Sequence, residues 1–233
     1  MKRVENPELA NKILEYLAVK YKLREIRTLE DGVHLSSTVY CRTRGYFDSS
    51  NEGIGATRQE LMLFALGYGL QDVMTPPDAS APMYECEGII YRPDLLFEAN
   101  NQLVEVKTTR KSSKPHFIDD EWLPETWMKY IKGGCYIRKT NRYDLVVLYL
   151  MGNYAPPFPQ IYADTLYFED YELEENWREV IANRDVLLNA KKTGVPPTPF
   201  QHCYQWECKD CRYKMVCEVL SRESAEKDIR ELW

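Results

Sequence analysis

One apolar run, DLVVLYLM at residues 144–151, constrains the fold more than any other part of the sequence. A continuous apolar strand of this kind lies centrally in a covered sheet, because both of its faces must be kept from water. Other candidate strands are CEGIIY, DLLF, QLVEVK and IYADTLYF, with the turn-like EANN joining the second to the third. The sequence therefore predicts a mixed α/β core in which helices flank a central mixed sheet.

Helical patterns occur before, between and after these strands. The stretch NPE near the N-terminus is typical of a helix start, and Thr57 with Glu60 forms a capping-box pattern that opens a second helix through LMLFALGYGLQDVM. The segment LPETWMKYIKGGCYIRK is also expected to be helical, although its two adjacent glycines weaken the pattern. A long helix is expected from about Asp170 to the linker TGVPPTPF, and the segment around Cys41 is expected to be a loop.

Length and composition are those of a globular protein with a full-sized core, at 233 residues, 44% hydrophobic and 28% charged. No apolar run approaches the roughly 20 residues that span a bilayer, and the N-terminus lacks the pattern of a signal peptide. We therefore expect a cytoplasmic location, or the host-cell cytoplasm if the protein is viral. The net charge of −6 argues against nucleic acid coating the whole surface but is compatible with a local basic track.

Three charged side chains are expected to meet on the sheet. In a strand, Glu105 and Lys107 project from the same face, and the short turn could bring Asp94 beside Glu105. Two carboxylates suit a hard cation such as Mg²⁺ or Mn²⁺, which can polarise a phosphodiester and generate a hydroxide nucleophile near neutral pH. Lys107 could orient that water or neutralise charge on the phosphate. The alternative is an ordinary solvated ion pair on an edge strand.

Four of the seven cysteines fall close together near the C-terminus. In WECKDCRYKMVC, the spacing Cys208-x2-Cys211-x5-Cys217 is that of metal ligands, which such clustering in a cytosolic chain favours over disulfides. The candidates for a fourth ligand are Cys203, His202 and Cys41. Either of the first two would close a local zinc knuckle, whereas the third would join the two ends of the chain.

The order of these motifs resembles that of RecB-like nucleases with an iron–sulfur cluster, among them CRISPR-associated, AddB-type and viral exonuclease members. The resemblance runs from about residue 36 to 217. It rests on a distant cysteine in S-x4-C-R-x-R-x-Y, on RPD followed by EVK, and on the C-terminal C-x2-C-x5-C. It implies a restriction-endonuclease-like core and a metal-dependent deoxyribonuclease acting on single-stranded DNA or DNA ends, as exonuclease or endonuclease.

The resemblance also implies a role for each matching residue. Asp94 and Glu105 would hold Mg²⁺ or Mn²⁺ together with the backbone carbonyl of Val106, and Lys107 would assist the attacking water. A structural [4Fe–4S] cluster would be held by four cysteines, which are Cys41, Cys208, Cys211 and Cys217.

A single nuclease domain over residues 1–233 is the expected organisation. Its core would lie at about 56–193, and a cysteine-rich cap formed by about 34–48 and 200–233 would join the N- and C-terminal parts. The family also implies protein partners in CRISPR adaptation, recombination-type repair or viral replication. The lack of a long apolar run predicts no membrane partner.

Two motifs of the family are altered in this sequence. Where the family has a histidine four residues after a glycine, the sequence has Gln71 in GYGLQD, and Glu60 and Asp72 could also approach the metal. A glutamine amide can coordinate through its oxygen, more weakly than an imidazole. The family's Q-x3-Y motif is missing, and Lys132 with Tyr136 is the nearest match.

Basic residues gather in three places despite the acidic total. The group that follows the active strand, at the expected mouth of the site, consists of Arg110, Lys111 and Lys114. The other groups are Lys129, Lys132, Arg138, Lys139 and Arg142, and Lys209, Arg212 and Lys214. Such phosphate contacts bind DNA without sequence preference. Rings on which unpaired bases could stack are Tyr91, Trp122, Trp127, Tyr130 and Tyr136.

Three hypotheses of function follow. The first is a metal-dependent DNA nuclease with a structural [4Fe–4S] cluster. The second is a non-catalytic nucleic-acid-binding protein of the same fold, which the altered histidine position permits. The third is a zinc-knuckle protein with an unrelated α/β core, in which Cys203 is a ligand and Cys41 is not.

Overall fold

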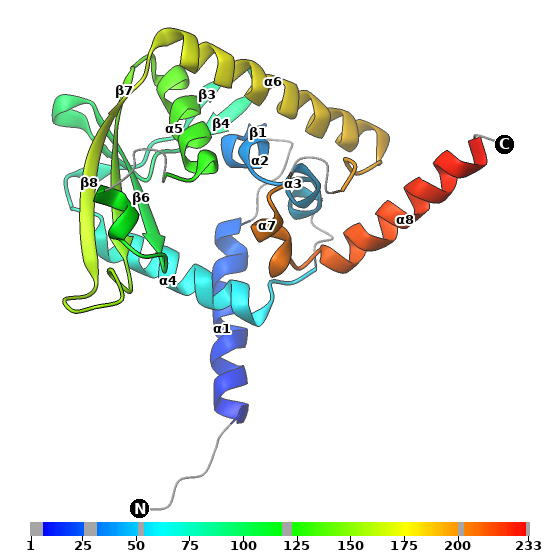
Figure 1. Cartoon of the computed structure of the whole chain (residues 1–233), viewed down its shortest axis with the longest axis horizontal. Coiled ribbons are helices and arrows are strands. Elements are labelled where there is room, and N and C mark those ends of the chain that lie inside the picture. Colours follow the sequence, from blue (N-terminus) through cyan, green and yellow to red (C-terminus); the bar gives the residue numbers. More distant parts are fainter. Residues whose placement is uncertain (1–6, 26–31, 51–53, 118–122, 200–202, 232–233) are drawn as a thin grey trace, which may run out of the picture.

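The structure is a computed structural model that describes residues 7–25, 32–50, 54–117, 123–199 and 203–231 (Figure 1). Its strands are β1 (Val33–His34), β2 (Ala79–Ser80), β3 (Tyr84–Cys86), β4 (Ile89–Tyr91), β5 (Leu95–Phe97), β6 (Gln102–Thr109), β7 (Arg142–Tyr149) and β8 (Gln160–Tyr167). Its α-helices are α1 (Pro7–Glu25), α2 (Leu35–Val39), α3 (Arg42–Ser49), α4 (Arg58–Met74), α5 (Glu125–Arg138), α6 (Asp170–Thr193), α7 (Gln205–Lys209) and α8 (Lys214–Glu231). Short 3-10 turns occupy Glu98–Asn100 and Lys114–Phe117.

The larger sheet has the strand order β2-β5-β6-β7-β8. β6 and β7 are parallel and are connected through α5, whereas the other neighbours in this sheet are antiparallel. β7 lies between two long strands, and four of its side chains are at most 1% exposed, namely Tyr143, Leu145, Val147 and Tyr149. The central strand predicted from the apolar run and the mixed α/β class are therefore confirmed.

Helices flank this sheet, as expected. α5 and α6 pack against each other, and α4 contacts β6. Figure 1 shows α5 and α6 beside the sheet, while α1 and α8 extend outward from the body of the molecule. Between the sheet and the helices lies a hydrophobic core that includes Tyr91 of β4, Leu145 of β7, Ile131 of α5 and Trp177 of α6.

A second, three-stranded sheet has the order β1-β4-β3. The single strand predicted over CEGIIY is wrong, because this segment turns back on itself as the hairpin of β3 and β4. The two turn residues, Glu87 and Gly88, have φ angles of 51° and 73°. A two-residue hairpin of this type needs positive φ at both positions, and the glycine adopts it without steric cost.

The adjacent glycines of α5 have a packing role that explains their presence in a helix. A Cβ at Gly133 would lie 2.8 Å from a side-chain carbon of Leu35, and a Cβ at Gly134 would lie 2.7 Å from the ring of Tyr91. Larger residues would therefore push α5 away from α2 and β4. The prediction of a helix here is confirmed, and the low helix propensity of the two glycines is offset by their close packing.

The N-terminal half contains more helix than the sequence indicated. The helix starting at Pro7 and the capping box of Thr57 and Glu60 are confirmed. The loop expected around Cys41 is wrong, since this residue lies between α2 and α3 and is the N-cap of α3.

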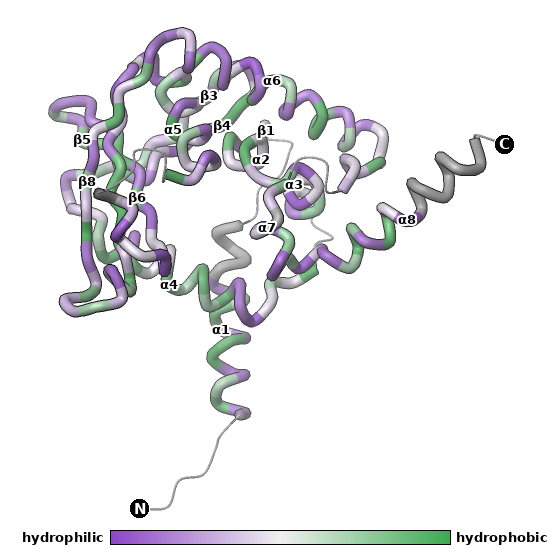
Figure 2. The backbone as a smooth tube through the Cα atoms, in the orientation of Figure 1, coloured by the Kyte–Doolittle hydropathy of each residue, from purple (hydrophilic) through white to green (hydrophobic). Residues whose placement is uncertain are grey.

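Figure 2 shows hydrophobic and hydrophilic segments alternating along α1 and α4. Within the described ranges, no helix is both long and apolar enough to cross a membrane.

Candidate functional site

Asp94 and Glu105 are brought together by strand register. β5 and β6 are antiparallel with Leu95 opposite Val104, so Asp94, one residue earlier, faces the position of Glu105. A carboxylate oxygen of Asp94, Oδ2, accepts a hydrogen bond from the backbone N–H of Val106 at 2.8 Å. The two carboxylates therefore lie side by side where β5 begins.

Gln71 reaches the same point from α4. Its amide nitrogen donates a hydrogen bond to Oδ1 of Asp94 at 2.8 Å. Both oxygens of Asp94 are thus engaged, one by the β6 backbone and one by Gln71, and the orientation of the carboxylate is fixed. The residue that replaces the family's histidine is therefore brought to the site.

Glu105 is the buried centre of the arrangement. It is 2% exposed, and one of its oxygens, Oε1, forms an ion pair with Lys107. The other oxygen, Oε2, is buried and has no hydrogen-bond partner among the described residues. Burial, and next the nearby carboxylate of Asp94, raise the pKa of Glu105 to about 8. Such a carboxylate would be stabilised by a cation.

Lys107 lies between the carboxylate of Glu105 and the ring of Tyr130. Burial opposes its charge, but the carboxylate of Glu105 outweighs that effect together with smaller contributions, so the pKa of Lys107 is raised and it stays protonated. Its ammonium lies 5.5 Å from the ring centroid of Tyr130, whose hydroxyl donates to the carbonyl oxygen of Arg92 at 3.0 Å. Tyr40, directly before Cys41, lies near Lys107, and burial raises the pKa of its hydroxyl. Sequence analysis missed Tyr40, and its position beside the distant cysteine was the available signal.

Other acidic and basic candidates lie elsewhere. Glu60 is buried in its capping box, 3.4 Å from the guanidinium of Arg44, and Asp72 is exposed on α4. On α5, Lys132 forms an ion pair with Glu172 of α6 at 2.9 Å. The ring of Tyr136 stacks on Trp177, with centroids 4.5 Å apart. The structure therefore does not bring Lys132 and Tyr136 together with Asp94 and Glu105.

The basic residues after β6 are better placed. Arg110, Lys111 and Lys114 are all exposed and follow the strand that carries Lys107. In contrast, Lys129 of the second basic group is paired with Glu125 and Glu179. Of the other residues named from the sequence, Trp122 and His202 lie outside the described ranges.

A second candidate site is a small pocket lined by cysteines from both ends of the sequence. Cys41 and Cys203 line it together with Cys208, Cys211 and Cys217. The sulfurs of Cys203 and Cys208 lie 3.3 Å apart. Cys135 is instead buried in the core, and Cys86 lies on β3. Within the described part of the chain, no three His, Cys, Asp or Glu side chains are arranged around a single ion.

The two sides of this pocket are joined through α3, which sequence analysis had not identified as a helix. Asp48 accepts hydrogen bonds from the guanidinium of Arg212 at 2.9 Å and from the hydroxyl of Tyr213 at 2.8 Å. Burial, followed by the neighbouring cysteines, raises the pKa of Cys217 to about 11. The thiol of Cys217 therefore needs a nearby positive charge, such as that of a metal, to ionise.

Comparison with known proteins gives a likeness of fold. No family model matches the chain, and no curated protein matches it. The solved structure of SSO0001 has a TM-score of 0.53 and 14% identity, over 91% of this chain and 97% of that one. An alkaline exonuclease from Laribacter hongkongensis has a TM-score of 0.46 and 15% identity, over 71% of this chain and 95% of that one. A phage-related exonuclease from Haemophilus somnus 129PT has a TM-score of 0.45 and 14% identity, over 68% of this chain and 82% of that one. The chain thus shares the fold of SSO0001 over nearly its whole length.

Proposed function

We propose that this protein is a Mg²⁺- or Mn²⁺-dependent deoxyribonuclease that hydrolyses phosphodiester bonds. The observation that carries the proposal is the buried Oε2 of Glu105, which lies beside Asp94 and has no hydrogen-bond partner among the described residues. A buried carboxylate oxygen without a partner is costly, and its raised pKa reflects that cost. A hard divalent cation bound by both carboxylates would remove it.

Three groups on β6 and directly before β5 would hold this cation. They are the carboxylates of Asp94 and Glu105 and the backbone carbonyl of Val106. The N–H of Val106 donates to Asp94, and the N–H and C=O of one strand residue point to the same side, so this carbonyl would lie on the same edge of β6 as Asp94. The bound cation would polarise the scissile phosphate and lower the pKa of a water ligand. Gln71 would act by holding Asp94 in position.

Lys107 would stabilise the negative charge that develops on the phosphate during hydrolysis. Its ammonium is fixed beside Glu105 and remains protonated because its pKa is raised. A donor that is already oriented toward developing charge needs no reorganisation during the reaction, and one such donor typically contributes about 10²- to 10³-fold in rate.

DNA is the proposed substrate, as single strands or at duplex ends, cut in an exonucleolytic or endonucleolytic manner. Support comes from Arg110, Lys111 and Lys114, which are exposed and directly follow the strand of Glu105 and Lys107. Contacts from these residues to phosphates would hold the strand without reading its sequence.

We also propose a structural [4Fe–4S] cluster in the cysteine pocket, with Cys41, Cys208, Cys211 and Cys217 as ligands. The shared pocket supports it, because this brings the distant Cys41 to the C-terminal cysteines. Four cysteine thiolates are the usual ligand set of such a cluster. Iron, sulfide and zinc analysis of anaerobically purified protein tests it. Loss of iron in Cys41→Ser but not in Cys203→Ser supports this ligand set, and zinc without iron contradicts the cluster.

The nuclease is tested with end-labelled single-stranded and blunt double-stranded DNA, incubated with Mg²⁺, Mn²⁺ or chelator. We expect metal-dependent cleavage that Glu105→Gln abolishes and that the matched change Glu98→Gln, at an exposed residue, leaves intact. A wild-type protein that binds DNA but cuts neither substrate with either metal would contradict the proposal. That result would favour a non-catalytic nucleic-acid-binding protein.

A further inference from the structure

The loop between β7 and β8, residues 150–159, lies against the basic segment that follows β6. The N–H of Leu150 donates to the carbonyl of Thr109 at 2.9 Å, and the N–H of Ser113 donates to that of Gly152 at 2.9 Å. The hydroxyl of Tyr154 donates to the carbonyl of Arg110 at 3.0 Å. Because β6 and β7 are parallel, both segments leave the same end of the sheet.

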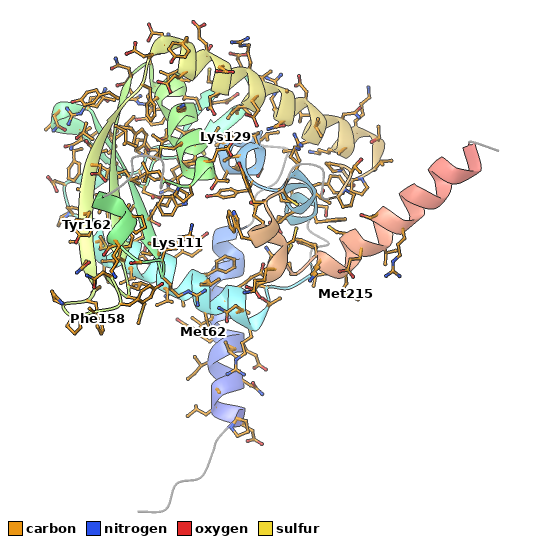
Figure 3. The ribbon with its side chains drawn as sticks, viewed as in Figure 1. Met62, Lys111, Lys129, Phe158, Tyr162 and Met215 are labelled. Carbon is orange, nitrogen blue, oxygen red and sulfur yellow. The ribbon has the colours of Figure 1, made fainter. Side chains whose placement is uncertain are left out.

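This loop exposes large apolar side chains next to those cations. Tyr154 is 64% exposed, Phe158 is 50% exposed and Met151 is 42% exposed. Tyr154 has a φ of 67°, a conformation that a bulky residue rarely adopts, and its ring stays largely exposed although its hydroxyl is bonded to Arg110. Figure 3 labels Phe158 near the tip of this hairpin and Lys111 beyond the end of β6.

The loop is held in place by side-chain contacts as well as by its backbone. The hydroxyl of Ser113 donates to the side-chain oxygen of Gln160 at 2.7 Å, and the amide of Gln160 donates to the carbonyl of Pro157 at 3.0 Å. The exposed rings are therefore carried by an ordered loop, and little conformational freedom would be lost when a ligand binds them.

The charged neighbours of the loop have no competing partners in the described structure. Among the described residues, the side chains of Arg110, Lys111 and Lys114 form no salt bridge. Rings predicted from the sequence for stacking are less accessible, since Tyr91 is 1% exposed and Tyr130 packs against the core. Exposed aromatics beside cations that form no salt bridge within the described ranges are typical of surfaces that bind unpaired nucleic acid.

We propose that the loop 150–159 is a base-stacking platform for single-stranded DNA, with Tyr154 and Phe158 under the bases and Arg110, Lys111 and Lys114 along the phosphates. This rests on the proposed nuclease function and adds the path of the substrate. Lys111 is four residues beyond Lys107, at most about 13 Å along an extended chain, so its phosphate contact would lie within a few nucleotides of the reacting phosphate. It favours a single strand because paired bases have no free faces to stack.

The test measures binding of a fluorescent single-stranded oligonucleotide in the uncleaving Glu105→Gln background. Stacking energies per ring imply that adding Tyr154→Ala and Phe158→Ala together weakens binding at least tenfold. The matched control is Tyr167→Ala, which removes an equally exposed tyrosine, 69% exposed, at the far end of β8. Tyr154→Phe keeps the ring but removes the hydroxyl that bonds to Arg110. Near-normal binding is expected, and this result would show that the alanine change acts by removing a stacking ring and not by disturbing the loop.

An oligonucleotide with abasic sites in place of its bases completes the experiment. It retains the phosphates, so it is expected to bind weakly and equally to the protein with and without the two loop changes. Equal binding of the normal oligonucleotide by both proteins would overturn the platform, even if the wild type cuts DNA. If binding depends on the two loop residues but the wild type shows no metal-dependent cleavage, the nuclease proposal is overturned and the platform proposal stands.

Discussion

The two candidate sites differ in how their residues are brought together. Asp94, Glu105 and Lys107 come from two adjacent strands, so the register of β5 against β6 is sufficient to assemble them. The cysteine pocket joins Cys41 to residues 203–217, and side-chain contacts such as those of Asp48 connect its two sides. The first arrangement follows from the backbone of the sheet. If the proposed cluster is present, the second would depend on it, because metal–ligand bonds would hold Cys41 to the C-terminal cysteines.

Asp94→Asn is expected to have the largest effect on DNA cleavage, and to leave the cysteine pocket unaffected. Asparagine keeps an oxygen for the N–H of Val106 but loses the charge that binds a cation, so Mn²⁺-dependent cleavage should fall by about 10³-fold. The thermal midpoint should fall by no more than about 3 °C, because only the hydrogen bond from Gln71 is lost, and the iron content should stay unchanged. Asp78→Asn, at an exposed position, is the control. A large fall in midpoint would show that Asp94 is chiefly structural.

Cys41→Ser is expected to affect the other region. Loss of one ligand should remove the cluster, reduce stability by at least about 3 kcal/mol and lower the thermal midpoint by about 10 °C. Visible absorbance, iron content and proteolysis of the C-terminal segment measure this. Well below its midpoint the variant should still cut DNA better than Asp94→Asn, and Cys86→Ser should match the wild type. An equal loss of DNA cleavage in Cys41→Ser and Asp94→Asn would indicate that the two sites are not independent.

Asp48→Asn tests the side-chain link itself. The carboxylate accepts from Arg212 and Tyr213 but is partly exposed, so its replacement should cost about 1 kcal/mol, or roughly 3 °C in the midpoint. Asp185→Asn, which breaks an exposed ion pair with Arg184, should cost less. If Asp48→Asn leaves the thermal midpoint of metal-free protein unchanged, the contacts of Asp48 do not hold the two sides of the cysteine pocket together.

A pH dependence of stability is the smallest expected effect. In metal-free protein the pKa of Glu105 is about 8, above its ordinary value of 4.5, so the folded state holds this proton more tightly than the unfolded state. The corresponding stability is complete below about pH 4.5 and is lost as pH rises toward 8. Relative to Glu105→Gln, the wild-type midpoint should therefore fall between about pH 5 and pH 8. An unchanged difference between the two proteins across that window would contradict the raised pKa.

Sequence reasoning was most successful where a local pattern determines the structure. The run in β7 requires a central strand, and Thr57 with Glu60 requires a helix start, so both were predictable. The positions of Asp94 and Glu105 also follow from strand alternation and a short turn. Gln71 was proposed from its spacing to a glycine, although the sequence did not indicate that it would donate to Asp94.

Other features depend on tertiary contacts that the sequence does not display. The hairpin turn at Glu87 and Gly88 lies inside CEGIIY, a stretch that resembles one strand. Lys132 is the nearest match to a family motif, but the acidic face of α6 provides it with Glu172 as a partner. The exposed rings of Tyr154 and Phe158 could not be identified, because composition alone does not distinguish exposed aromatics from those of the core.

Titration of metal-free protein with Mn²⁺ tests most directly the claim that Asp94 and Glu105 hold a divalent cation. Calorimetry or manganese electron paramagnetic resonance should show binding to the wild type and to Glu98→Gln. Binding should be lost or weakened at least about tenfold in Glu105→Gln, which corresponds to about 1.4 kcal/mol. Equal Mn²⁺ affinity in all three proteins, or no binding by the wild type, would contradict the account.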